Sequence, residues 1–157
     1  MMMHELEARI RKVEDIEEIK NLEARYVYLV DTLQMDKVPD LFVDNLIVDF
    51  GHLGTFKTKA ELLEFLNGAR TGTSMMCHQE MTPYIEVDGD KATGTWYLLG
   101  LFTHVTPQGE VAAWIQGRCD NEYVRVDGKW KYSRRIFKFN LHSPYEDGWV
   151  KTRLMQG

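Results

Sequence analysis

The sequence contains few of the residues on which disulfide-rich, membrane and secreted proteins depend. Its two cysteines, Cys77 and Cys119, lie far apart and outside any Cys-x-x-Cys motif, so we expect two reduced, packed thiols. No apolar run approaches the roughly 18 residues that a membrane span requires. The first residues, Met1-Met-Met-His-Glu, lack the basic start and apolar stretch of a signal peptide. We therefore expect a cytoplasmic protein with no membrane partner.

Positive charge is also scarce, because 19 Lys and Arg against 24 Asp and Glu give a formal net charge of -5. Nucleic acids bind basic patches, so no nucleic-acid partner is expected. No glycine-rich phosphate loop, dinucleotide fingerprint or Gly-x-Ser-x-Gly elbow is present. The histidines are dispersed without zinc-like spacing, so we expect neither a metal nor a cofactor; they include His52, His78, His104 and His142.

The chain has the length and composition of one globular domain, which we take to span residues 1–157. It is 44% hydrophobic and 27% charged, and 157 residues suffice to bury a core. Apolar residues recur at intervals of three and four from Glu5 to about Leu33, which predicts an amphipathic helix. A break near Glu14-Asp15, where a new N-terminus would start, is the alternative. The core-facing stripe is expected to contain Ile19, Leu22, Tyr26, Leu29 and Leu33.

The rest of the chain changes from short helical segments to strands. A turn with a short helix is expected over Asp36 to Phe42 and a β-like segment over Asn45 to Phe50. Thr58, with Glu61 in a capping box, predicts a second helix that ends at Gly68. From Met75 onward the pattern is that of strands separated by hairpin turns. These include Met81–Val87, which leads into the first hairpin, and then Ala92–Val105, Val111–Val126 and Trp130–Leu141. Helices followed by an antiparallel meander indicate the α+β class, with a curved sheet around the first helix and a conical cavity between them.

Asp31 is the anomaly of the first helix, because it follows Val27, Leu29 and Val30 in an otherwise apolar turn. Burying a carboxylate without a partner disfavours its charge, so Asp31 requires a donor. The best candidate is His78, which ends the run Met75-Met-Cys-His. The two groups form either an acid–base dyad in a closed pocket or a polar pair kept for structure.

Other residues are candidates for the pocket wall. Tyr26 lies about 140° around the helix from Asp31 and about 7.5 Å along it, so it either contacts substrate or is simply core. Alternation places Trp96, Leu98, Gly100 and His104 on one strand face, where Gly100 would widen the cavity. His104 would then either reach the cavity mouth or sit idle at the rim. The neighbouring strand offers two further wall candidates, Trp114 and Gln116.

Arg134 and Arg135 point to opposite faces of the last strand, so one of them can look inward. Alternation with Trp130 and Tyr132 favours Arg134 as the inward residue. An inward arginine would bind a carboxylate or stabilise a developing oxyanion. The alternative is a salt bridge at the sheet surface.

Several motifs together resemble the SnoaL-like branch of the nuclear transport factor 2-like superfamily over roughly residues 10 to 142. The resemblance is closest to the branch that holds scytalone dehydratase, bile-acid 7α-dehydratase and hexachlorocyclohexane dehydrochlorinase. It implies a cone-shaped, cystatin-like α+β barrel that assembles as a homodimer or homotrimer. The motifs are Tyr26 with Asp31, the His-x-x-x-Thr-Pro segment from His78, Val87-Asp-Gly-Asp, Thr93-Gly-Thr-Trp-Tyr and Asp127-Gly-Lys-Trp.

The resemblance also implies an activity. In those lyases a helix aspartate orients a strand histidine that removes a proton; Asp31 and His78 match these positions, and Tyr26 matches a tyrosine that holds substrate. Phe50 and Gly100 depart from the pattern, because polar groups of the dehydratases fall at these positions. Loss of those groups counts against elimination of water, since a departing hydroxide needs a proton donor.

We therefore expect a cofactor-independent lyase, of dehydratase or dehydrochlorinase type, that acts on a small hydrophobic molecule, steroid-like or aromatic. One alternative is a ketosteroid-type isomerase, which would place Asp49 or Asp120 inside the cavity as the base. The other is a non-catalytic ligand-binding or assembly module, which would show a filled cavity and Asp31 separated from His78.

Overall fold

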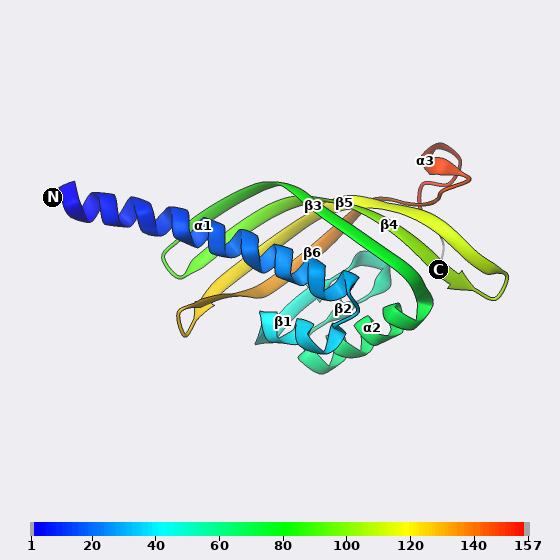
Figure 1. The fold of residues 1–157 in the computed structure, drawn as a ribbon, viewed down its shortest axis with the longest axis horizontal. Coiled ribbons are helices and arrows are strands. Elements are labelled where there is room, and N and C mark those ends of the chain that lie inside the picture. The colour runs from blue at the N-terminus through cyan, green and yellow to red at the C-terminus, as the bar shows by residue number, and fades with distance from the viewer. Residues whose placement is uncertain (1, 156–157) are drawn as a thin grey trace.

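One long helix packs against a curved six-stranded sheet in the computed structural model, which describes residues 2–155 (Figure 1). The strand order is β2-β1-β6-β5-β4-β3; β1 runs parallel to β6, and all other neighbours are antiparallel. This arrangement confirms the predicted α+β class with a mixed sheet. The elements are α1 (Met2–Asp31), η1 (Met35–Leu41), β1 (Phe42–Asp49), η2 (Gly51–Leu53), β2 (Thr55–Phe56), α2 (Lys59–Gly72), β3 (Thr73–Asp88), β4 (Lys91–Thr106), β5 (Gly109–Val126), β6 (Lys129–Pro144) and α3 (Gly148–Lys151).

The first helix is continuous, so the alternative of a break near Glu14-Asp15 is wrong. Asp15 is instead buried, and its carboxylate accepts hydrogen bonds from Arg125 at 2.7 Å and from the Trp130 indole at 3.1 Å. The predicted stripe is buried except for Leu33, which follows the helix at a φ of 60° and is 43% exposed. The first turns of α1 project beyond the strands (Figure 1).

The second helix begins as predicted and ends later. Thr58 accepts a hydrogen bond from the Glu61 amide at 3.2 Å, and the Glu61 carboxylate accepts one from the Thr58 amide at 3.1 Å. Gly68 does not end the helix, because a single glycine costs only about 1 kcal/mol in a helix interior. The helix has one more turn, to Gly72, and β3 begins at the next residue, Thr73.

Two irregularities in β6 decide which of its side chains face the helix. Glu122 pairs with Arg134 and Tyr123 with Tyr132, so Ser133 is an extra residue in the ladder. A bulge of this kind shifts alternation by one position. A second shift occurs at Asn140. Gly117 pairs with Phe139 and Gln116 pairs with Leu141, so Asn140 is an extra residue in the ladder.

The chain after β6 loops round so that residues 153–155 lie beside His142 in a short parallel bridge. The His142 amide donates to the Arg153 carbonyl at 2.8 Å, and the Met155 amide donates to the His142 carbonyl at 2.7 Å. Ser143 and Pro144 still belong to β6, and the described residues after His142 do not line the cavity between the helices and the sheet. Among residues 2–155, no helix combines the length and hydropathy needed to span a membrane.

Candidate active site

A largely apolar cavity of about 290 Å³ lies between the two long helices and the inner face of the sheet. Its wall includes side chains from α1, α2 and four strands, among them Tyr26, Phe50, Leu98 and Phe102. Cavities of this size that carry a few placed polar groups are typical of small-molecule sites. The polar groups in this wall include His78, Arg135, His104 and His142, together with the hydroxyls of Tyr26 and Thr73.

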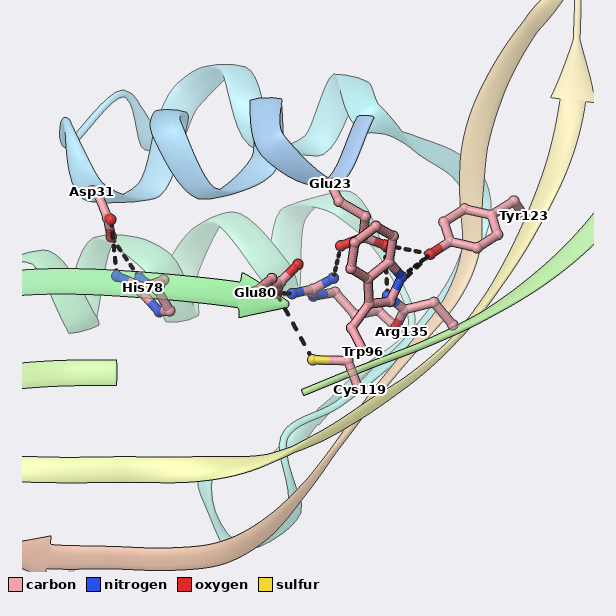
Figure 2. A network of polar contacts seen from close by, with 9 residues as sticks. Glu23, Asp31, His78, Glu80, Trp96, Cys119, Tyr123 and Arg135 are labelled. Atoms are coloured by element: carbon pink, nitrogen blue, oxygen red, sulfur yellow. Dashed lines mark hydrogen bonds and ion pairs between the residues drawn. The ribbon is translucent and has the colours of Figure 1, made fainter. Parts of the chain in front are cut away.

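Asp31 and His78 are held together at the wall of this cavity, as the sequence predicts (Figure 2). The His78 Nδ1 atom lies 2.5 Å from Asp31 Oδ1, and the His78 backbone amide donates to Asp31 Oδ2 at 2.9 Å. Because a carboxylate accepts, Nδ1 carries the hydrogen, and in the neutral imidazole Nε2 is then the nitrogen with the lone pair. The two side chains are 20% and 14% exposed, so the pair is mostly shielded from water.

The contact between Asp31 and His78 connects the end of α1 to strand β3. Asp31 is the last residue of α1, where the helix dipole and the free carbonyls disfavour a negative charge. Two hydrogen bonds from a residue 47 positions away offset that disadvantage. The carboxylate thereby joins the end of the helix to the sheet at the position of the candidate base.

Gly100 shapes the site differently from the expectation that it widens the cavity. It faces His78 across the β3–β4 ladder, and a Cβ atom at this position would lie 2.3 Å from the Phe102 ring. The Phe102 ring therefore fills the space, and its centroid lies 4.9 Å from that of His78 in an edge-to-face arrangement. Because Gly100 has no side chain, the Phe102 ring can pack beside His78.

Arg135, and not Arg134, is the inward arginine. The extra residue Ser133 reverses the alternation on which the sequence argument relied, so Arg135 is 1% exposed and reaches the cavity wall. Arg134 is on the outer face, with 47% of its side chain exposed and a 3.7 Å ion pair to Glu122. The surface salt bridge considered for one of the two arginines is therefore the one made by Arg134.

Arg135 is bound by two buried acids, Glu23 and Glu80. It contacts Glu23 at 2.8 Å and also bonds to Glu80 (Figure 2). Its guanidinium lies 4.1 Å from the centroid of the Tyr26 ring. Burial acts to raise the pKa of Glu23, but the charge of Arg135 and several hydrogen bonds bring it below its usual value. Burial and the nearby charge of Glu23 hold the pKa of Glu80 well above normal, despite Arg135. Of the two acids, we therefore assign the first proton that the pair takes up to Glu80, and Glu23 is the anion that faces Arg135.

The Trp96 side chain lies behind this cluster and not on the cavity wall. Its indole donates to the Tyr123 hydroxyl at 3.0 Å, and that hydroxyl in turn donates to Glu23 (Figure 2). Asn121 donates to the same Glu23 oxygen at 2.7 Å. The expectation that Trp96 lines the pocket fails because its ring is drawn into this hydrogen-bond network.

Trp114 and Gln116 do not face the cavity either. They lie on the outer face of β5, where Trp114 stacks on Tyr145 at 6.3 Å and Gln116 accepts a hydrogen bond from Asn140 at 3.0 Å. The inner positions of β5 are Ile115 and Cys119. Alternation predicted which residues share a face, but sequence alone did not say which face is inside. Leu98 and Phe50 do line the cavity, as expected.

Two histidines that are far apart in the sequence, His104 and His142, meet at the cavity. The sequence did not predict this contact. His104 Nε2 and His142 Nε2 lie 2.9 Å apart, and the His52 ring is 5.8 Å from the His142 ring. Alternation on β4 placed His104 on the inner face, but no signal placed His142 there. Within residues 2–155 no three histidine, cysteine or acidic side chains are arranged to hold a metal ion.

Comparisons with known proteins place this geometry in a family. The chain is similar to the dehydrochlorinase LinA-type3 from Novosphingobium barchaimii, at 23% identity over 87% of this chain and 93% of that one, with a TM-score of 0.79. It also resembles a proposed scytalone dehydratase from Novosphingobium aromaticivorans, at 19% identity over 85% and 89% of the two chains, with a TM-score of 0.77.

A third solved structure, from Novosphingobium aromaticivorans, is described as an NTF2-like protein with a cystatin-like fold. It shares 23% identity over 85% of this chain and 87% of that chain, with a TM-score of 0.70. At these identities the likeness shows the fold, which is the NTF2-like, cystatin-like fold that the motifs implied. The SnoaL-like domain profile matches residues 11–136, which is most of the sequence, and the chain therefore belongs to the SnoaL-like family.

Proposed function

We propose that this protein is a cofactor-independent lyase that removes a proton from carbon and releases a leaving group from a small hydrophobic molecule. One observation carries the proposal: the Nδ1 atom of His78 is fixed by Asp31 at 2.5 Å, which leaves the Nε2 lone pair of a cavity-lining ring free. A neutral imidazole held in this tautomer can accept a proton from substrate at Nε2.

The reaction is a base-promoted elimination. His78 Nε2 takes a proton from a carbon of the substrate, and the electrons of that C–H bond form a C=C double bond. The leaving group departs from the adjacent carbon with the electrons of its own bond. Asp31 stabilises the imidazolium until the proton passes to solvent, and a positioned base of this kind contributes about 10²- to 10⁴-fold to a rate.

Tyr26 and Arg135 are the candidates to polarise the substrate oxygen or the leaving group. Burial raises the pKa of Tyr26 to about 12, so its hydroxyl keeps its proton at neutral pH and acts as a donor. Arg135 presents a guanidinium whose charge is balanced by Glu23. A neutral substrate suits these surroundings, because an additional buried charge would lack a counter-ion.

The leaving group is a halide or another stabilised anion. Phe50 lines the cavity with a hydrocarbon ring, and the Gly100 position is occupied by the Phe102 ring. Neither position offers the proton that a departing hydroxide requires. Elimination of water would therefore rely on Tyr26, whose raised pKa makes it a weak proton donor.

The two alternatives are supported less well. The isomerase would need an inward carboxylate, but Asp49 accepts a hydrogen bond from the Gly51 amide, and Asp120 pairs with Arg118 and Lys138 near the surface. Neither carboxylate lines the cavity. The non-catalytic module would have a filled cavity and separated dyad partners, whereas the structure has about 290 Å³ of space and a 2.5 Å contact.

The test uses two probes that report on proton removal from carbon. Loss of a proton opens 5-nitrobenzisoxazole to a coloured phenolate, and elimination from hexachlorocyclohexane releases chloride. We expect the wild type to accelerate at least one reaction and His78→Ala to abolish the acceleration, with the exposed His4→Ala as control. Background rates for the wild type with both probes, or normal turnover by folded His78→Ala, would refute the proposal.

A further inference from the structure

A second polar site lies in the same cavity, and the elimination mechanism does not use it. His104 from β4 and His142 from β6 present their Nε2 atoms to each other at 2.9 Å, and both side chains line the cavity. The Phe102 ring lies between this couple and the dyad; its centroid is 4.9 Å from His78 and 6.0 Å from His104. The couple therefore lies one aromatic ring away from the candidate base.

The couple is held in place from one side. The His142 side chain is 7% exposed and stacks on Phe139 at 5.9 Å and on His52 at 5.8 Å. His104 is only half-buried, and its imidazole has aromatic contacts with Phe102 and His142. His142 is thus the fixed member, and His104 is the ring that can rotate.

Both rings are uncharged at neutral pH. Burial lowers the pKa of His142 to about 4, helped by the neighbouring rings of His104 and His52, and burial also lowers the pKa of His104. Two neutral imidazoles 2.9 Å apart share one hydrogen, so one Nε2 donates and the other accepts. His142 Nδ1 is buried without a partner, which favours His142 as the Nε2–H donor because a bare lone pair costs less than an orphaned N–H.

We propose that the His104–His142 couple is a recognition site for a hydroxyl group of the ligand. A hydroxyl inserted between the rings accepts a hydrogen bond from one Nε2–H and donates one to the other Nε2, so both nitrogens remain satisfied. A carbonyl, ether or halide only accepts, and it would leave one imidazole nitrogen without a partner. Rotation of His104 makes the room for the oxygen.

The ligand class follows from the rest of the cavity. The wall is largely hydrocarbon and the two imidazoles carry no charge, so the ligand is a neutral alcohol or phenol with an apolar body. An anion would find no counter-charge at this end, and the described residues form no metal site. This inference names a substrate feature and so rests on the proposed function, but it concerns binding and can be measured without turnover.

The experiment compares two ligands of the same shape. 2-Naphthol and 2-methylnaphthalene differ by a hydroxyl against a methyl group, and the Kd of each is measured by titration at neutral pH. The ratio of the two dissociation constants is then compared among the wild type, His104→Phe and His142→Phe, in which a ring of similar size is kept. We expect the preference for the hydroxyl to fall by about tenfold or more in both variants, as loss of two hydrogen bonds predicts.

His78→Ala is the control that separates this proposal from the proposed function. It should abolish elimination and leave the ratio of dissociation constants unchanged. A ratio that is unchanged in His104→Phe and His142→Phe would overturn the inference. A ratio that changes in His78→Ala alone would overturn it as well, because the hydroxyl would then bind at the dyad. Using one variant from each of two strands keeps the test decisive if one of them fails to fold.

Discussion

Asp31 and His78 are joined at two points, with one carboxylate oxygen on the imidazole Nδ1 and the other on the backbone amide of the same residue. A single side-chain contact would let the ring and the carboxylate rotate independently. Two contacts fix the carboxylate relative to both the strand and the ring. The orientation of His78 is therefore set before any substrate enters the cavity.

The first prediction concerns the carboxylate. Asp31→Asn removes the charge that stabilises the imidazolium, so we expect kcat for 5-nitrobenzisoxazole to fall by about 10²- to 10⁴-fold with little change in KM. Steady-state kinetics of the folded variant measure this. Asp49→Asn, at a carboxylate outside the cavity, is the matched control. A fall in Asp49→Asn as large as that in Asp31→Asn would argue against the assigned role.

The second prediction compares the two acids bound to Arg135. Burial and the charge of Glu23 raise the pKa of Glu80, so replacing this carboxyl by the neutral amide in Glu80→Gln should change the free energy of unfolding by less than about 1 kcal/mol. Glu23→Gln leaves Arg135 without its anion and should cost about 3 to 5 kcal/mol. Denaturant titration of both variants measures the difference, and equal losses would contradict the assigned proton.

The raised pKa of Glu80 also makes the stability of the folded protein depend on pH. The pKa of Glu80 is raised in the folded state, so the folded protein binds more protons than the unfolded chain above the usual glutamate range. This contribution to stability is present at low pH and is lost as pH rises through the folded pKa. Glu80→Gln should therefore show a flatter decline in stability toward alkaline pH than the wild type, and identical slopes would refute the prediction.

The third prediction uses adjacent residues on opposite faces. Arg135→Met leaves two buried acids without their cation and should destabilise the protein by about 3 to 5 kcal/mol, because an uncompensated charge remains buried. Arg134→Met loses only an exposed contact, and its effect should be within about 0.5 kcal/mol. Thermal or denaturant unfolding of the two variants tests the assignment; if Arg134→Met were the more destabilised variant, the assigned faces would be reversed.

The fourth prediction concerns Gly100. Gly100→Ala would force the Phe102 ring away from a Cβ atom that it cannot accommodate at 2.3 Å, so we expect a loss of about 1 to 3 kcal/mol. Displacing this ring also removes its edge-to-face contact with His78, so elimination should slow as well. Gly68→Ala, in an open part of α2, should instead be neutral or stabilising. An unchanged unfolding midpoint in Gly100→Ala would contradict this prediction, because it would show that the Phe102 ring can adopt another position without cost.

The fifth prediction concerns acid stability. The folded pKa of His142 is about 4, below that of an unfolded histidine, so the unfolded chain binds the extra proton between these two values. Stability is then lost as pH falls through that window, by up to about 1.4 kcal/mol per pH unit for one group. His142→Phe should remove part of this slope. Parallel stability curves for wild type and variant between pH 6 and pH 4 would contradict it.

Much of the fold could be predicted from local signals. The period of three and four in α1, the capping box at Thr58 and the hairpin turns gave the order and type of the elements. The Asp31–His78 contact could also be inferred, because an acid in an apolar turn requires a donor. These inferences depend only on neighbours in sequence or on a single physical requirement.

The rest of the site depends on information that one sequence does not contain. Trp114 and Gln116 share a face, but only the assembled sheet shows that this face is outside. Ser133 carries no turn signal, so the shift that turns Arg135 inward is not visible in advance. The meeting of His104 with His142 requires both the register of three strands and the second shift near Asn140.

The two extra residues in β6 also bear on how such proteins diverge. Insertion or deletion of one residue at Ser133 or Asn140 would exchange the inward-facing and outward-facing residues in the next part of β6. The strand order would stay the same. A lineage could thus acquire a new set of cavity-facing groups in one step. An alignment of relatives that places no gap in this strand would compare the inside of one protein with the outside of another.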